Sequence, residues 1–285
     1  MSRRTISLAG LTLLLVPATL AAQENWRSVA TSRSHRGEKE LRVDVRFGAG
    51  RLDIKPGPAG SLYKATLHYD PRAFRPVTEY RDGRLRVGLN TERGTKVRSH
   101  KAGEIALALG PEVPITLDLE FGAAEADVDL GGLRIRRVEV STGASQTSLR
   151  FSRPNPEPLS VIQIEVGAAA FRAEGLGNAN AERISVDGGL GDVVLDFSGE
   201  WQRDMTADID MGLGALTLRV PEGVGLHVMK DGLLAAFDSQ GLIKRGKGYY
   251  SPDWDTASRR LTIRVDAALG SIDLQWVKPV AASLP

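Results

Sequence analysis

The sequence predicts an all-β chain folded as a β-solenoid with about 21–24 residues per coil. Three observations predict it. A short pattern recurs along the chain: an apolar-x-apolar segment, then Gly, then Ala or Leu, then another small residue. Apolar residues alternate with polar ones on both sides of each small-residue turn, which is typical of strand–turn–strand units. No convincing helical stretch of ten or more residues follows the N-terminal segment.

A glycine marks the centre of each repeated turn, where it permits a positive φ or a close approach of backbones. In five consecutive copies the central glycines are 21, 24, 22 and 23 residues apart. A unit of this length cannot bury its own apolar face, so the copies are expected to stack as coils. With an earlier and a last copy, the turn glycines are Gly48, Gly122, Gly143, Gly167, Gly189, Gly212 and Gly270. The alternative is an antiparallel β-sandwich with a hairpin about every 8–12 residues, and the persistent spacing favours the solenoid.

Stacked coils predict two apolar columns inside the solenoid, with strands of successive coils about 4.8 Å apart. The column before the turn holds Leu119, Val140, Ile164, Val186 and Ile209. The column after the turn holds Val128, Leu149, Ala173, Leu195 and Leu218.

The chain divides into four regions. Residues 1–22 have the pattern of a secretory signal peptide: Arg3 and Arg4, an apolar run over 6–16 that is too short to span a bilayer, and small residues at Ala21 and Ala22. A short membrane anchor is the alternative. Residues 23–110 form an N-terminal β cap region, with a hairpin turn at Asp82-Gly83. Residues 111–280 form the solenoid and residues 281–285 form a tail. Within the solenoid region, residues 221–260 are expected to leave the repeat pattern as a long connection, which we call the excursion. Trp276, which follows it, is expected to plug the open end of the last coil.

Composition excludes several classes of protein. The chain has 285 residues, of which 42% are hydrophobic and 25% charged, with 31 Gly and no Cys. These values argue against disorder, and the lack of Cys excludes disulfides, zinc–thiolate sites, thiol catalysis and a lipid anchor on cysteine. Two of the 37 basic residues and none of the 35 acidic ones lie in residues 1–22, so the remaining chain is charge-balanced. Nucleic-acid binding would need a basic excess.

The C-terminal third resembles the toast-rack group of bacterial cell-envelope proteins. The resemblance lies in the segments 212–221, 222–225, 241–242, 249–250 and 268–274, and extends over roughly residues 110–277. The group includes the C-terminal domain of the LiaF-type envelope-stress proteins and the DUF4097 "putative adhesin" family. The resemblance implies a right-handed parallel β-solenoid outside the cytoplasm, often linked to envelope stress, with no established catalytic residues. The chain departs from LiaF-type regulators because the sequence after residue 22 contains no transmembrane segment.

Carboxylates recur two residues before the turn glycine, so stacked coils would align them in an outward row. The position holds Glu120, Ser141, Glu165, Asp187, Asp210 and Asp266. Like charges about 5 Å apart repel by about 1 kcal/mol in water, which favours a solvated polar face. Calcium bound by Glu165, Asp187 and Asp210 is the alternative. No cofactor is expected.

The aromatic residues Tyr249, Tyr250 and Trp254 are the candidate binding residues, since sugars and proteins both bind exposed rings. The alternative, which we favour, is that they pack the excursion against the solenoid. The histidines and serines form no metal or hydrolase motif. Carboxylates at Asp187, Asp192, Asp196, Asp208 and Asp210 leave a carbohydrate-active β-helix enzyme as an alternative, which would need a carboxylate pair at a defined separation.

These observations predict a secreted or periplasmic binding or scaffold module at the cell envelope that is not an enzyme, acting in envelope stress or adhesion. The expected partner is an envelope protein or a cell-wall or surface polysaccharide. Strand edges at the solenoid ends could pair between copies, and the sequence leaves the oligomeric state open.

Overall fold

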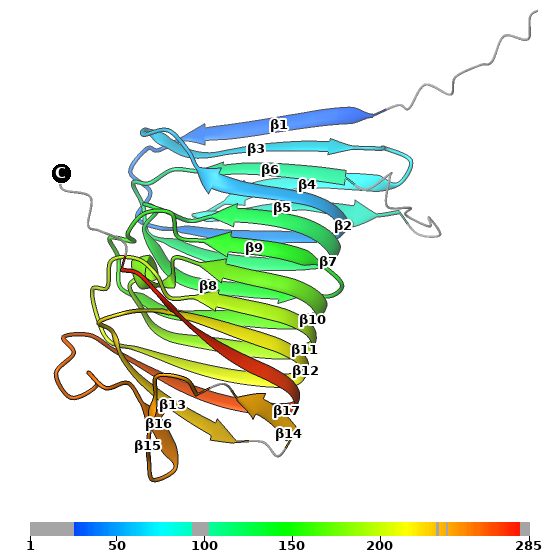
Figure 1. Ribbon diagram of the computed structural model, residues 1–285. Helices are drawn as coiled ribbons and strands as arrows, with labels where there is room; N and C mark the ends of the chain where they lie inside the picture. Colours follow the sequence, from blue (N-terminus) through cyan, green and yellow to red (C-terminus); the bar gives the residue numbers. More distant parts are fainter. Residues whose placement is uncertain (1–25, 93–102, 232–233, 238, 280–285) are drawn as a thin grey trace, which may run out of the picture.

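The protein is a stack of β-rungs that form one 17-stranded sheet (Figure 1). The structure is a computed structural model that describes residues 26–92, 103–231, 234–237 and 239–279. The predicted signal peptide, the predicted tail and residues 93–102 lie outside these described residues. Six long strands fold back at their middle, so that each supplies both sides of one rung. They are β2 (Leu41–Pro56), β7 (Ile115–Asp129), β10 (Leu159–Glu174), β11 (Ala181–Asp196), β12 (Met205–Pro221) and β17 (Arg260–Val277).

Shorter strands complete the stack. Three rungs are each split into two strands, and the remaining strands add antiparallel edges at the two ends. The split rungs are β5 (Arg84–Thr91) with β6 (Gly103–Leu109), β8 (Ile135–Thr142) with β9 (Gln146–Arg150), and β13 (Gly225–Asp231) with β14 (Leu234–Phe237). The edges are β1 (Arg27–Ser34), β3 (Ser61–Tyr69) and β4 (Phe74–Arg81) at one end and β15 (Ile243–Arg245) and β16 (Gly248–Tyr250) at the other; a 3₁₀ turn, η2, spans Leu176–Ala179.

Neighbouring rungs pair in parallel, as a solenoid requires. The order along the stack is β5/β6, β2, β7, β8/β9, β10, β11, β12, β17 and β13/β14. The first and the last long strands are therefore out of sequence order: β2 lies between β5/β6 and β7, and β17 lies between β12 and β13/β14. The parallel stack thus begins within residues 41–109, the region expected to be a cap.

The expectation that Trp276 plugs the last coil is wrong. Trp276 lies on β17, where it pairs in register with Val220 of β12, and β13/β14 form the rung beyond it. Pairing of residues 225–231 with β17 makes part of the expected excursion a rung of the solenoid. The expected hairpin at Asp82-Gly83 is confirmed, because β4 and β5 pair antiparallel and both turn residues have positive φ.

The two predicted apolar columns are confirmed. Leu119, Val140, Ile164, Val186 and Ile209 occupy one register position in consecutive rungs, and each is at most 3% exposed. The second column is equally in register and buried: Val128, Leu149, Ala173, Leu195 and Leu218. The core therefore lies between the two halves of every rung.

The turn glycines are required by close stacking. A Cβ on Gly212 would lie 2.6 Å from the carbonyl oxygen of Gly189, and a Cβ on Gly189 would lie 2.9 Å from that of Gly167. Gly270, the glycine of the last copy, lies at a second position of the turn. It pairs with Gly214, two residues after the turn glycine, in a column where the backbone itself has a positive φ, 131° at Gly270 and 152° at Gly214.

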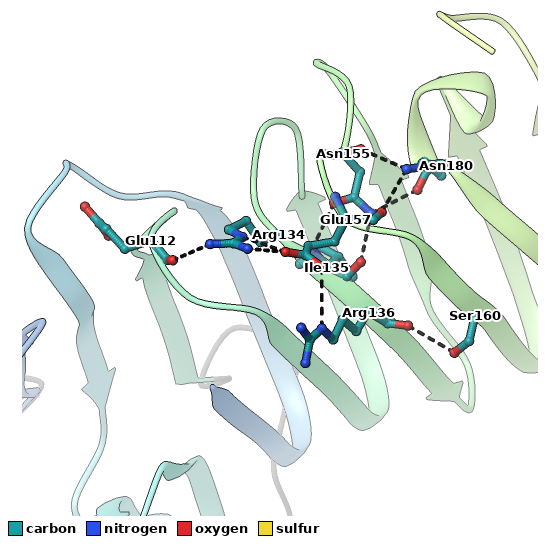
Figure 2. Close-up of polar contacts among 9 residues, drawn as sticks. Glu112, Arg134, Ile135, Arg136, Asn155, Glu157, Ser160 and Asn180 are labelled. Atoms are coloured by element: carbon teal, nitrogen blue, oxygen red, sulfur yellow. Dashed lines mark hydrogen bonds and ion pairs between the residues drawn. The ribbon is translucent and has the colours of Figure 1, made fainter. Parts of the chain in front are cut away.

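At the loop edge of the rungs, side-chain amides hold successive coils together (Figure 2). Asn155 is fully buried; its Nδ2 donates to the carbonyl oxygens of Ile135 and Ala179, and its Oδ1 accepts from the Ile135 amide. Asn180 donates in turn to the carbonyl oxygens of Asn155 and Glu157. These bonds satisfy backbone polar groups of the loop edge, among them the amide and the carbonyl of the buried Ile135.

Arg134 anchors the same edge through the Glu157 carboxylate and the carbonyl oxygen of Glu112 (Figure 2). These hydrogen bonds, followed by the charges of Arg134 and Arg136, hold the pKa of Glu157 below its usual value even though partial burial opposes the shift. The loop edge is thus a structural network, and it leaves the folded-back edge as the surface to consider for function.

Candidate interaction surface

The predicted row of carboxylates exists and runs along the folded-back edge of the rungs. Glu120, Ser141, Glu165, Asp187 and Asp210 lie in register in consecutive rungs. The row continues with Asp266 of β17 and Asp231 of β13. All of the carboxylate residues are exposed.

The two ends of this row differ in how their charges are compensated. Arg46 lies 3.3 Å from Glu120, and Glu165 accepts hydrogen bonds from Ser141 and Gln163. In the part of the chain that the structure describes, no hydrogen bond or ion pair compensates Asp187, Asp210 or Asp266. The C-terminal end of the row is therefore the more negative one.

The carboxylates of this row do not converge on one point at which they could bind calcium. Glu165, Asp187 and Asp210 lie one above another on separate rungs, and among the described residues no three His, Cys, Asp or Glu side chains are grouped so that they could hold a metal ion. Calcium prefers six to eight oxygen ligands around one point, which a straight row of single carboxylates does not supply.

A row of exposed leucines, which the repeat pattern alone did not mark as exposed, accompanies the uncompensated carboxylates. Leu190, Leu213 and Leu269 are 51%, 47% and 47% exposed and lie in register in β11, β12 and β17. Each follows its aspartate by three residues, so the sequence Asp-x-x-Leu-Gly occurs in all three rungs. We call this surface the Asp-Leu edge; it consists of Asp187, Leu190, Asp210, Leu213, Asp266 and Leu269.

The Asp-Leu edge is confined to the C-terminal rungs. The position of its leucines holds Ala168 in β10, Ala123 in β7 and Ala49 in β2. Beside these smaller residues a shallow groove runs along the turn glycines, with Glu120 and Glu165 among its lining residues. Alanine is thus compatible with the fold here, and the leucines are not required for packing.

The aromatic residues singled out by the sequence are brought together, with His227 among them. The His227 ring stacks on Tyr250 with centroids 4.1 Å apart. The Trp254 ring meets both rings edge-on, with centroids 5.5 Å from His227 and 5.6 Å from Tyr250. Burial, followed by the charge of Arg264, lowers the pKa of His227. All these rings are half-buried against one another, which supports a packing role for the excursion; ligand binding by Tyr249, Tyr250 and Trp254 stays a prediction.

Two of the carboxylates on which the alternative of a carbohydrate-active enzyme rested already have partners within the protein. Asp208 lies between Arg183 and Arg264, at 3.1 and 3.0 Å, and Asp196 accepts a hydrogen bond from the Ser198 amide. A different acid, Asp118 of β7, has a raised pKa, chiefly because of its partial burial. No local sequence pattern pointed to Asp118, because the charged groups around it come from neighbouring rungs.

On the same face, the rungs on either side of Asp118 add further carboxylates. Asp44 and Glu139 raise the pKa of Asp118 as well, and Arg46, 3.8 Å away, opposes the shift.

Comparison with known proteins now defines the class of protein. Residues 21–173 and 155–219 match the family described as "N-terminal domain of toast_rack, DUF2154". The match covers more than half of the chain, so this protein belongs to the toast-rack family. The matched region reaches further toward the N-terminus than the segments in which the sequence resembles that family.

The solved structures that match this chain have low sequence identity to it. One is a "putative cell adhesion protein" from Clostridium sporogenes, with 17% identity and a TM-score of 0.44 over 88% of this chain and 100% of that one. Another is a "putative adhesin" from Bacteroides fragilis, with 12% identity and a TM-score of 0.38 over 87% of this chain and 97% of that one. No curated protein matches the chain. Within the described residues, no helix has the length and hydropathy needed to cross a membrane.

Proposed function

We propose that this toast-rack protein is a non-catalytic binding or scaffold module that acts outside the cytoplasm at the bacterial cell envelope, in adhesion or in the response to envelope stress. The observation that carries the proposal is the Asp-Leu edge, where three half-exposed leucines are aligned on stacked rungs beside uncompensated carboxylates. Contiguous exposed apolar side chains rimmed by polar ones are typical of interaction sites. The signal-peptide pattern of residues 1–22 supports the location.

Fractionation and affinity capture test this proposal. The tagged full-length chain is expressed in its own host, cross-linked in the intact cell and purified, beside a variant that lacks residues 2–22. We expect a shortened chain in an extracytoplasmic fraction and one or more envelope components enriched with it, and neither from the variant. An unprocessed chain in the cytoplasm, or a capture identical for both forms, would contradict the proposal.

A carbohydrate-active enzyme remains the second candidate, because Asp118 with its raised pKa lies between further carboxylates on one face. A raised pKa is what a general acid in glycoside cleavage requires. Incubation of the purified chain with envelope polysaccharides distinguishes the two functions: the binding module releases no reducing ends. Release that is abolished by Asp118→Asn would establish the enzyme instead.

A further inference from the structure

We propose that the Asp-Leu edge binds an amphipathic helix of a partner polypeptide, one that presents a row of apolar side chains beside a parallel row of Lys or Arg. This inference deepens the proposed function and rests on it. The inference rests on three features: the edge is continuous across neighbouring rungs, its aspartates are negatively charged, and its leucines are spaced by the distance between rungs.

The edge is continuous only because of the chain's topology. Residues 210–213 and 266–269 are 56 residues apart in sequence, yet β17 inserts beside β12 and brings them into adjacent rungs. Beyond β17, Asp231 lies in register with Asp266. The Asp-x-x-Leu pairs recur in register in three consecutive rungs, those of β11, β12 and β17, which lie in the C-terminal half of the stack (Figure 1).

The charges select a cationic partner. Asp187, Asp210 and Asp266 lie in adjacent rungs, and the basic side chains nearby, Arg183 and Arg264, are already paired with Asp208. Lysines or arginines that approach the row would relieve its repulsion, and complementary charges at an interface fix register and favour encounter. An anionic lipid surface would be repelled.

A second copy of the chain fits the edge less well. Two residues beyond the leucines lie Asp192, Ala215 and Ser271, none of them basic. On the other side of the edge Arg183 and Arg264 are already paired with Asp208, so neither side offers an unpaired basic side chain to an opposing copy. Two such edges in contact would bury apolar side chains and leave every carboxylate without a cation.

The spacing of the rows selects a helix over an extended strand. Rungs repeat about every 4.8 Å, and one turn of an α-helix advances about 5.4 Å. A helix aligned with the stack therefore departs from the leucine row by only about 1 Å over its two intervals. Side chains on one face of a strand repeat about every 6.7 Å and would depart by about 4 Å. Helices that lay apolar anchors at i, i+3, i+4 and i+7 on a partner are a common mode of recognition.

A synthetic peptide tests the proposal on the full mature chain. The probe is a helical peptide of leucine and lysine whose leucines form one row and whose lysines form the adjacent row. Its control has the same composition in shuffled order, without rows. Three variants are compared by calorimetry: L190A/L213A/L269A, which places in three rungs the alanine already present in β10; D187N/D210N/D266N; and Ile243→Ala, a matched control, because Ile243 is 46% exposed but lies on β15, away from the edge.

We expect the leucine variant to bind the peptide at least tenfold more weakly and the aspartate variant to lose the salt dependence of binding, while Ile243→Ala stays within twofold of the parent chain. Thermal unfolding of each variant confirms that it is folded. Equal binding of the shuffled peptide, equal weakening by Ile243→Ala, or no binding at all would overturn the proposal.

The other occupants of the edge have readouts of their own. Binding of zwitterionic vesicles that the leucine variant loses would identify lipid as the occupant, and a dimer that dissociates in this variant would identify a second copy; either result replaces the helix. If envelope components are captured equally by the parent chain and the leucine variant, the proposed function stands and this inference fails.

Discussion

Replacement of Asn155 by alanine probes the loop-edge network most sharply. The side chain is fully buried, and it makes hydrogen bonds of 2.8 and 3.0 Å to the carbonyl oxygens of Ile135 and Ala179 and one of 3.0 Å from the Ile135 amide. Alanine would leave these three backbone groups without their partner at the junction between coils. Ile135 is the first residue of β8, where the pairing with β7 is irregular, and Ala179 lies in the 3₁₀ turn, so we expect no regular strand pairing to replace the lost bonds.

The expected loss follows from those three groups. A buried polar group left unpaired costs about 1–3 kcal/mol. Relaxation and entry of water offset part of the sum, so we expect Asn155→Ala to lower the free energy of unfolding by about 3–5 kcal/mol. Such a loss is a large fraction of the roughly 5–15 kcal/mol by which a folded domain is stable.

Urea unfolding followed by circular dichroism measures the effect, with the midpoint and the slope fitted together. Ser160→Ala is the matched control, because the exposed Ser160 hydroxyl donates a single hydrogen bond, to the carbonyl oxygen of Arg136 (Figure 2). We expect the control to change the free energy of unfolding by less than about 0.5 kcal/mol. If Asn155→Ala costs no more than this control, the network does not hold the coils together and the reasoning is refuted.

Three further substitutions test other parts of the structure. In Gly214→Ala the new Cβ would lie 1.8 Å from the carbonyl oxygen of Gly191 at a φ of 152°, so we expect a loss of at least about 2 kcal/mol in a denaturant titration. Glu157→Gln should lower the melting temperature at pH 7. The pKa of Glu157 is depressed in the folded state, so its stabilisation is present above its usual pKa near 4.5 and is lost as the pH falls further; the difference between variant and parent should therefore shrink by pH 3. Asp118→Asn should do the opposite: burial raises the pKa of Asp118, so its charge at pH 7 is a cost, and removing it should stabilise the fold by less than about 1 kcal/mol, a gain that disappears toward acid pH; destabilisation would contradict this.

Much of the fold could be predicted from the sequence because stacked rungs repeat the same local chemistry. The columns that begin at Leu119 and Val128 follow from the turn spacing alone, since parallel rungs in register must align residues at equal distances from the turn. The insertions of β2 and β17 could not be predicted, because they depend on pairing between distant segments, which no local pattern specifies. The last copy has Ala268 where β10, β11 and β12 have the central turn glycine, and its own glycine, Gly270, aligns with Gly214.

The candidate site was predictable only in part. The carboxylate row followed from the position before the turn, and its stacking is confirmed. The recurrence of Asp-x-x-Leu-Gly at residues 187, 210 and 266 was a signal for the leucines as well. Alternation alone does not say whether an apolar residue at a turn faces the core or solvent, so the exposure of Leu190, Leu213 and Leu269 needed the structure.

Site-specific photocross-linking in the living cell tests most directly whether this protein binds a partner through the Asp-Leu edge. A photoreactive amino acid is placed at Leu213, at the centre of the edge, or at Ile243, which is exposed to a similar extent but lies beside the aromatic excursion. We predict a discrete product with another envelope polypeptide from position 213 and none from position 243. A product from position 243 alone, or none from either position, would contradict the account.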